Sequence, residues 1–408
     1  MDHFDVVVIG AGPAGIFAAL TCANAGSKVA LIDKNKEIGR KILISGGGRC
    51  NLTQYEEMTD FVKNFGKNLN FTKPALLNFT NKDFIKFLNK NGLETTVAQN
   101  NKVFPKSKRA SDVTQLLAKL LQKSGVFLIS NTAVVDIKKD NSLFNIDIVS
   151  KTVKTSFVVI ATGGTSFPTT GTTGDGHIFA KKLGHKIIPT NFALAPLFIK
   201  NFELTKFAGL SFVNIAYTHW RGERKIGSYS GDMLITHRGI SGPGIMNNTR
   251  YMASNDVVKI NFFNDNAETG RDKLINFLSK NPKITVKNCL EALDVPKRLM
   301  EYFLVCANID GTLTCGQLKK DDRNKLITQL TAYPMQIKSV GCKNSAMVTA
   351  GGVSLKDVDS KTMASRRVSG LFFAGEVLDV DGDTGGYNIQ FAVSSGVLAG
   401  ESINKEML

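Results

Sequence analysis

The sequence predicts an α/β fold whose first domain, a parallel sheet with an antiparallel meander, is split by an inserted β-barrel-like and helical domain. Three observations predict it. A short apolar run near the N-terminus is followed by a glycine turn and a helical segment. The middle of the chain has a mixed strand and helix character. Glycine-rich strand and turn segments then return near the C-terminus.

Length and composition indicate a globular protein of more than one domain. The chain has 408 residues, of which 43% are hydrophobic and 21% are charged. Its six cysteines form no C-x-x-C pair, so we predict no zinc knuckle, no thioredoxin-like couple and no metal site. Sparse cysteines are typical of a reducing compartment, and we expect a cytoplasmic protein.

The uncharged segment from Val6 to Ser27 resembles a signal peptide or a membrane span only superficially. Asp2 and Asp5 precede it where a signal peptide needs positive charge, and glycines and a proline interrupt it. No other segment has the composition of a span. We therefore expect no membrane partner.

The first element is a βαβ unit. Phe4–Ile9 is an apolar run without alternation, as in a parallel strand covered on both faces. The sequence GAGPAG follows, then a helix over Ile16–Ala25, and then the strand KVALID, which ends at Asp33.

The rest of the first domain follows the same style. Helical spacing predicts helices over Asp83–Asn91 and over Ser111–Ser124, with Ser111 as the N-cap. Phe127–Ile160 alternates like a set of strands and ends in the buried run FVVIATGG. A closing helix is predicted from Tyr387.

The inserted domain begins near Pro189, where the pattern of strand-like and helical segments in the sequence changes. We predict a discontinuous first domain over residues 1–190 and 337–408, with an insert over residues 191–336. The insert contains strand-like segments such as FVNIAYTHW and a helical subregion at about 265–310. The segment THRGISGP, with Ser241 as a possible N-cap, ends its β-rich part.

The glycine turn has the spacing of a dinucleotide-binding motif. Gly10 permits a tight turn, Gly12 lets the backbone approach a pyrophosphate, and Gly15 allows close packing of the helix on the strand. The helix N-terminus then faces the phosphates. Asp33 ends the next strand, where its carboxylate can hold ribose hydroxyls. These features together predict a Rossmann-like nucleotide site.

Later segments favour FAD over NAD as the nucleotide. Ala161–Gly164 ends a strand with small residues, and Gly375 and Glu376 follow another buried strand. Gly385–Gly386 opens the final helix, whose N-terminal dipole would stabilise negative charge on the reduced flavin ring. An enzyme that binds only NAD does not need these C-terminal segments to contact its cofactor.

These motifs carry a family resemblance. The arrangement is similar to that of glutathione-reductase-type FAD flavoproteins. Within them, GRKILISGGGRCNLT, THRGISGP, VTAGGV and GEVLDVDGDTGGYNIQFA resemble the BaiN/RdsA family, also called YhiN-like flavoproteins. The resemblance runs from end to end and implies an FAD-binding domain split by an insert.

The resemblance also implies site residues. The glycine run Gly46–Gly48 would lie along the FAD, with Arg40, Lys41 or Arg49 offsetting phosphate charge and Asn51 bonding a ring edge or the loop. The other residues that we predict in the cofactor site are Pro13, Ala14, Lys34, Ser45, Val134, Thr162, Gly163, Tyr387, Asn388 and Ile389.

Two residues are candidates for catalysis, each with a structural alternative. Cys50 can protonate a substrate carbon opposite the flavin hydride, or it is a small buried residue in a tight loop. His237 can polarise a substrate carbonyl or bind a phosphate, or it belongs to a polar turn before a helix.

The charge balance bears on the substrate. There are 51 Lys and Arg against 35 Asp and Glu, a net charge of +16, which reflects either an anionic partner or compositional drift. Cationic stretches at Lys102–Arg109, Lys181–Lys186 and Arg221–Lys225 can bind phosphates, and Trp220 or Phe104 can stack on a base. Each stretch can also be an ordinary solvated turn.

Three functions remain open at this point. The first, which we favour, is reduction of uridine to dihydrouridine in large-subunit ribosomal RNA or its precursor, by hydride transfer from reduced flavin to an activated C=C bond. The second is a small-molecule oxidoreductase of bile-acid type or another metabolite, and the third is a non-enzymatic flavin-binding module. No second nucleotide motif is evident, so NADPH or NADH is expected only as a transient electron donor. The sequence does not set the oligomeric state.

Overall fold

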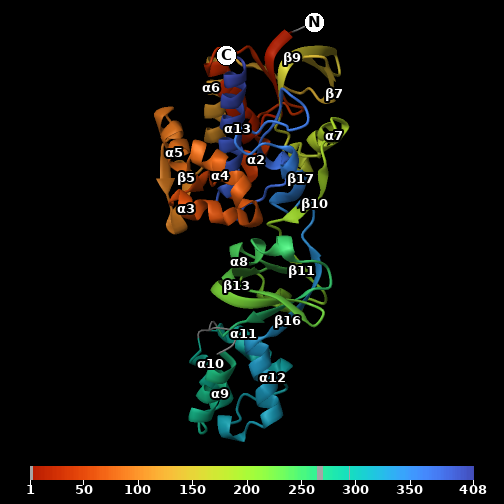
Figure 1. Ribbon diagram of the computed structural model, residues 1–408. Helices are drawn as coiled ribbons and strands as arrows, with labels where there is room; N and C mark the ends of the chain where they lie inside the picture. Colours follow the sequence, from red (N-terminus) through yellow and green to blue (C-terminus); the bar gives the residue numbers. More distant parts are fainter. Residues whose placement is uncertain (1–2, 264–269, 294) are drawn as a thin grey trace. The chain divides into compact units, whose positions relative to one another are not determined.

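The computed structural model describes residues 3–263, 270–293 and 295–408, which form two compact units (Figure 1). The first unit consists of Met1–Ala193 and Lys343–Leu408, and the second of Leu194–Cys342. Each has its own buried apolar core. The sequence placed the boundaries at 190/191 and 336/337. Both lie inside strands, the first in β10 (Ile187–Ala193) of the first unit and the second in β16 (Tyr333–Val340) of the second unit.

The first unit is built on a seven-stranded sheet of order β6-β2-β1-β9-β8-β7, with β18 also paired to β9. β6, β2, β1, β9 and β18 are parallel, whereas β7, β8 and β9 form an antiparallel meander. The predicted fold class is therefore confirmed. The strands are β1 (His3–Ile9), β2 (Val29–Ile32), β6 (Phe127–Ile129), β7 (Val134–Asp140), β8 (Leu143–Ile148), β9 (Lys151–Ile160) and β18 (Leu371–Phe373).

The N-terminal helix α1 and the C-terminal helix α13 pack together (Figure 1). Small residues make this approach possible, because a Cβ atom on Gly400 would lie 2.7 Å from Cβ of Thr21. The helices of the unit are α1 (Pro13–Asn24), α2 (Arg40–Ile44), α3 (Met58–Phe61), α4 (Leu69–Asn78), α5 (Asn81–Lys90), α6 (Ala110–Lys123), α7 (Asp175–Lys182) and α13 (Tyr387–Glu406).

Most predicted helices of the first unit lie where expected, with small differences at their ends. The final helix begins at Tyr387 as predicted. Helix α6 begins one residue earlier than expected, and its N-cap is Arg109, which makes no side-chain cap bond. The prediction of Ser111 as N-cap was wrong, because this residue already lies inside the first turn.

Two small sheets complete the first unit. One has the order β3-β5-β4 and supports the loop that follows α2. The other pairs β10 with β17, so the glycine-rich segment VTAGGV is a strand and not a second nucleotide turn. The strands are β3 (Thr53–Gln54), β4 (Thr95–Val97), β5 (Lys102–Pro105), β10 (Ile187–Ala193) and β17 (Val348–Val353).

The second unit contains a closed antiparallel barrel of order β11-β14-β13-β12-β15-β16. Alternate residues of β12, such as Ile215, Tyr217 and His219, are buried, as expected for strands with one face toward a barrel interior. The other strands are β11 (Leu197–Ile199), β12 (Ser211–Arg221), β13 (Arg224–Ile235), β14 (Gly239–Ser241) and β15 (Val257–Asn261).

Helices α8 to α12 belong to the second unit, and α9 to α12 form its helical part. The predicted helical subregion of 265–310 was too short at its C-terminal end, because α12 continues to Thr331. Its residues 265–269 and 294 lie outside the described residues. Gly242, and not Ser241, is the N-cap of α8. The helices are α8 (Pro243–Met246), α9 (Gly270–Lys280), α10 (Val286–Glu291), α11 (Lys297–Cys306) and α12 (Lys320–Thr331).

Among the described residues, no helix has both the length and the apolar composition needed to cross a membrane.

Candidate functional site

Four parallel strands of the first unit end at one level. Ile9, the last residue of β1, pairs with Ile32 at the end of β2 and with Ile160 at the end of β9. Phe373 at the end of β18 pairs with the same Ile160. Nucleotides bind at this carboxyl edge in doubly wound folds. Four segments that the sequence assigned to one site therefore meet here, at Gly10, Asp33, Ala161 and Ala374.

The glycines of the first turn have different surroundings. Gly10 has a φ of +102°, and a Cβ atom there would lie 2.5 Å from the carbonyl oxygen of Ala161. A Cβ atom on Gly15 would overlap the carbonyl oxygen of Gly10. Gly12, in contrast, has no heavy atom within 4 Å of the Cβ position. Gly10 and Gly15 therefore serve packing, whereas Gly12 leaves open space beside the turn.

The N-terminus of α1 is prepared for an anion. Its N-cap is Gly12, which supplies no side-chain acceptor, and Pro13 has no N–H to satisfy. The N–H groups of the first turn carry the positive end of the helix dipole, which favours an anion at this end of the helix. Asp33 stands beside them, because its Oδ2 accepts a hydrogen bond of 2.6 Å from the N–H of Ala11.

Several buried polar atoms at this site have no hydrogen-bond partner among the described residues. They are Oγ1 of Thr162, Oδ1 of Asn51 and Oγ1 of Thr53. A buried polar atom without a partner costs about 1 to 3 kcal/mol, which a ligand rich in hydroxyl and amide groups would relieve. The residues present therefore fit FAD at this edge of the sheet.

The glycine run forms an exposed left-handed turn. Gly46, Gly47 and Gly48 have φ values of 56°, 66° and 83°, and the run forms the short helix η1 (Ser45–Gly48). These values are costly for residues with a side chain, which explains the three glycines. The loop continues to the N-terminus of α13, where a Cβ atom on Gly386 would lie 2.7 Å from Cα of Thr53.

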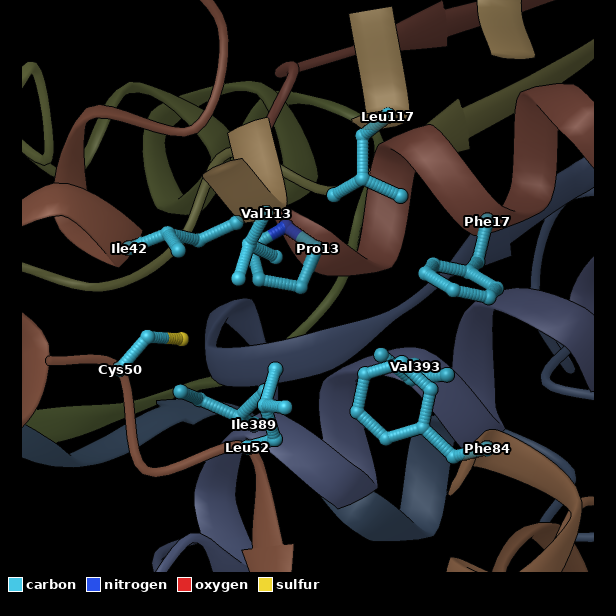
Figure 2. Close-up of a pocket in the computed structure, with 10 residues that line it drawn as sticks. All are labelled: Pro13, Phe17, Ile42, Cys50, Leu52, Phe84, Val113, Leu117, Ile389 and Val393. Carbon is cyan, nitrogen blue, oxygen red and sulfur yellow. The ribbon is translucent and has the colours of Figure 1, made fainter. Parts of the chain in front are cut away.

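Cys50 is buried in the same loop. It also has a positive φ, 57°, and its thiol points into a small apolar cavity (Figure 2). Burial raises the pKa of the thiol to about 11, although a hydrogen bond with Ser45 opposes the shift. These surroundings favour the structural alternative for Cys50, and its catalytic role stays a prediction. The cavity is lined by Pro13, Phe17, Ile42, Cys50, Leu52, Phe84, Val113, Leu117, Ile389 and Val393.

A polar network joins α2 to the segment after β18. Lys41 Nζ lies 2.7 Å from Glu376 Oε2 and donates a 2.8 Å hydrogen bond to Ser166 Oγ. Ser166 and the N–H of Thr349 both donate to Glu376 Oε1, at 3.0 and 2.9 Å. The sequence had placed Lys41 against a phosphate. Ser166 and Thr349 were missed, although both are small polar residues in glycine-rich segments.

Other predicted cofactor residues bond to the protein around the site. Lys34 forms an ion pair of 2.5 Å with Asp175, and Arg40 donates to Asn35 at 3.0 Å. Asn388 closes the loop before α13, because its Oδ1 accepts from the N–H of Gly382 at 2.8 Å. Val134 begins β7, two residues after Thr132, whose N–H donates to the carbonyl of Asp33 at 3.0 Å.

The second unit carries the remaining candidates. His237 is exposed between β13 and β14, and its role stays a prediction. Trp220 has Lys259 Nζ 4.3 Å from its ring centre, so one face is already covered. Phe104, in the first unit, is only 9% exposed and lies beneath Arg49, so the prediction that it stacks on a base was wrong.

Comparison with known proteins identifies the family of the chain. Residues 4–402 match the model of the HI0933-like protein Rossmann domain. The chain belongs to the HI0933-like family. The resemblance stated from the motifs is thereby confirmed, and with it the assignment of the chain as a flavin-dependent oxidoreductase that uses FAD. A non-enzymatic flavin-binding module is not retained.

Relatives within this family have two kinds of substrate in their names. The chain is 36% identical to a ribosomal RNA dihydrouridine synthase of Escherichia coli (strain K12), over 97% of this chain and 96% of that protein. It is 30% identical to a 3-dehydro-bile acid delta(4,6)-reductase of Clostridium scindens, over 97% of this chain and 98% of that protein.

Solved structures show the same fold at low identity. An open flavocytochrome c3 fumarate reductase matches with a TM-score of 0.54 and 18% identity, covering 100% of this chain and 79% of that one. A 3-ketosteroid delta1-dehydrogenase from Sterolibacterium denitrificans matches with a TM-score of 0.54 and 12% identity, covering 100% of both chains. These likenesses support the fold alone.

Proposed function

We propose that this protein reduces uridine to dihydrouridine in large-subunit ribosomal RNA or its precursor, with NADPH or NADH as a transient electron donor. The observation that carries the proposal is the 36% identity, over nearly the whole of both chains, to a ribosomal RNA dihydrouridine synthase. A second relative of the same description, from Haemophilus influenzae, is 32% identical over 99% of this chain.

The geometry of the glycine run supports a large substrate. Gly46 to Arg49 are exposed, so a nucleotide in a strand of RNA can approach them from outside. The apolar cavity beside Cys50 has a volume of only about 10 Å³, far below the roughly 300 to 1,000 Å³ typical of small-molecule pockets. This cavity therefore does not supply a closed site for a steroid.

The parts of the site have separate tasks in this proposal. Bound FAD, once reduced by NADPH or NADH, would supply a hydride to the C5–C6 bond of uracil, and a proton from the medium would complete the reduction. The N-terminus of α1 and Asp33 would hold the pyrophosphate and ribose. Glu376, fixed by Lys41 and Ser166, would accept a hydrogen bond from a cofactor hydroxyl at its Oε2 atom. The open turn at Gly46–Gly48 would let the flavin and the target base meet.

The test is the dihydrouridine content of large-subunit ribosomal RNA. A strain that lacks the gene should lose a dihydrouridine, and the wild-type gene should restore it. A gene carrying Gly12→Ala, which fills the space beside the turn, should not restore it. An unchanged dihydrouridine content in the deletion strain would refute the proposal.

A small-molecule substrate remains the second candidate because of the 30% identical bile-acid reductase. It predicts turnover of a conjugated steroid enone by the purified FAD-loaded protein in the absence of RNA. Loss of dihydrouridine in the deletion strain together with no enone turnover would remove this candidate.

A further inference from the structure

Two contacts fix the Arg49 side chain but leave most of its guanidinium N–H groups without a hydrogen bond to the described residues. Its Nε donates a 3.2 Å hydrogen bond to the carbonyl of Gly46, and its guanidinium carbon lies 5.5 Å from the ring centre of Phe104. The bond and the cation–π contact restrict the side chain. Its two Nη groups have no partner in the part of the chain that the structure describes, and the residue is exposed.

The strand beneath Arg49 carries a second cation on the same face. Phe104 belongs to β5, and Lys102 lies two residues before it. Side chains two residues apart on a strand point to one face of the sheet, so Lys102 faces the side on which Arg49 lies. Lys102 is half-buried, and its ammonium has no partner within the described ranges. We call this pair the Arg49–Lys102 face.

This face lies next to the cofactor site. The loop that carries Arg49 continues into β3, and just before this strand the N–H of Leu52 donates to the carbonyl of Val103 at 2.8 Å. Thr53 in turn contacts Gly386 at the N-terminus of α13. Arg49 therefore stands at the outer side of the glycine run, where a substrate arriving from solvent meets the site.

Several of the other cations predicted for RNA binding already have acidic partners. Within the same stretch, Lys106 is paired with Glu94 at 2.6 Å and Arg109 with Asp112 at 3.2 Å. In the second unit, Arg221 donates from both sides of its guanidinium to Asp256, at 2.9 and 2.8 Å. These side chains are already neutralised. The Arg49–Lys102 face is not.

We propose that the Arg49–Lys102 face binds the phosphates of single-stranded RNA and guides the target uridine to the flavin. This rests on the proposed function, and it moves Arg49 from the cofactor phosphates, where the sequence placed it, to the substrate. A guanidinium with two free Nη groups matches the bidentate geometry of a phosphate, and an ammonium adds a point charge.

The experiment measures binding of a fluorescein-labelled oligouridylate to the FAD-loaded protein by fluorescence anisotropy over a range of KCl concentrations. Each lost phosphate contact on a single strand lowers the slope of log affinity against log salt by about 0.7, which is about a fivefold loss of affinity at 0.1 M salt. Arg49→Met and Lys102→Met should each show this loss, and the double variant should show both.

Controls separate the face from general charge and from the cofactor. Lys119→Met removes an exposed charge on α6 of the same unit, outside the predicted cationic stretches, and should leave the slope unchanged. Arg49→Lys keeps the charge and should restore the slope. All variants should retain FAD, measured by the flavin absorbance of the purified protein.

The outcomes that overturn the inference are distinct. If Arg49→Met binds the oligouridylate like wild type, the face is not the RNA site, even where dihydrouridine formation stands. If Arg49→Met loses FAD, Arg49 belongs to the cofactor. If the wild type shows no salt-dependent binding of the oligouridylate, both this inference and the proposed RNA substrate fail.

Discussion

Gly10 and Gly12 belong to one motif, but they differ in backbone conformation and in the space available for a side chain. Gly10 needs its backbone conformation and lacks room for a side chain within the protein itself. Gly12 has ordinary backbone angles, φ −80° and ψ −179°, and free space where its Cβ atom would be. The first glycine is therefore required by the fold, whereas we propose that the second is required by the ligand.

Replacing each glycine by alanine should separate these two requirements. Gly10→Ala should lower the free energy of unfolding of the first unit by about 2 to 4 kcal/mol, from strain and overlap. Gly12→Ala should change the stability of the FAD-free protein by about 0.5 kcal/mol or less and weaken FAD binding about tenfold or more. Urea unfolding and titration with FAD measure both effects. A Gly12→Ala protein that binds FAD like wild type would contradict this assignment.

The partly buried pair of Lys41 and Glu376 should also be coupled in energy. Removing one partner leaves the other charge partly desolvated, so Lys41→Met and Glu376→Gln should each destabilise the FAD-free protein. In a double-mutant cycle, the coupling should be about 1 to 3 kcal/mol. Lys34→Met is the control, because the ion pair between Lys34 and Asp175 is more exposed. If Lys34→Met and Lys41→Met lower the free energy of unfolding equally, the network around Glu376 does not stabilise the protein more than an exposed ion pair does.

At the scale of elements, the barrel has a buried charged group at the start of β15. Asp256 is 3% exposed and accepts hydrogen bonds from His219 at 2.7 Å and from Arg221 at 2.8 and 2.9 Å. Burial raises the pKa of Asp256, but the bonds from Arg221 and His219 outweigh it and lower the pKa to about 2. The ionised carboxylate thus stabilises the junction of β12 and β15.

This pKa has a defined consequence for stability against pH. Because the pKa is lower in the folded state, the contribution is present above about pH 4 and is lost as the pH falls toward 2. Its size is about 2 kcal/mol. Trp220 is the single tryptophan of the chain and adjoins His219, so its fluorescence during urea unfolding reports on this region. The wild type should lose stability between these pH values more steeply than Asp256→Asn. Parallel pH profiles would contradict the assignment.

Elements with a local signal could be predicted from the sequence, and those made by distant pairing could not. The strand at Phe4–Ile9, the glycine turn and the helix from Tyr387 are encoded by neighbouring residues. Lys41 and Glu376, in contrast, are 335 positions apart, and both were expected to face the cofactor. Their pairing depends on β18 joining β9, which no local pattern specifies. The same holds for Phe104, whose place beneath Arg49 requires the β3–β5 pairing.

At the scale of the whole molecule, the two units have separate apolar cores, and the predicted site residues at the strand ends belong to the first. Ligands stabilise only the part of a protein that binds them. Added FAD should therefore raise the unfolding midpoint of the first unit, which is measured by the release of flavin. The unfolding transition of the second unit, measured by Trp220 fluorescence, should stay nearly unchanged. Coincident transitions that shift together with FAD would show that the two units unfold cooperatively.

Strand β18 is synthesised long after the strand with which it pairs, and this affects folding during translation. Residues 371–373 emerge from the ribosome long after the glycine turn, and until then Val158–Ile160 of β9 lacks the neighbour with which they pair. Nascent or truncated chains that lack β18 would expose this part of β9 as an edge strand with unpaired backbone N–H and C=O groups, which promotes aggregation. Because β18 and α13 follow the rest of the first unit in the chain, we expect FAD binding, measured by flavin absorbance, only after these segments have been synthesised.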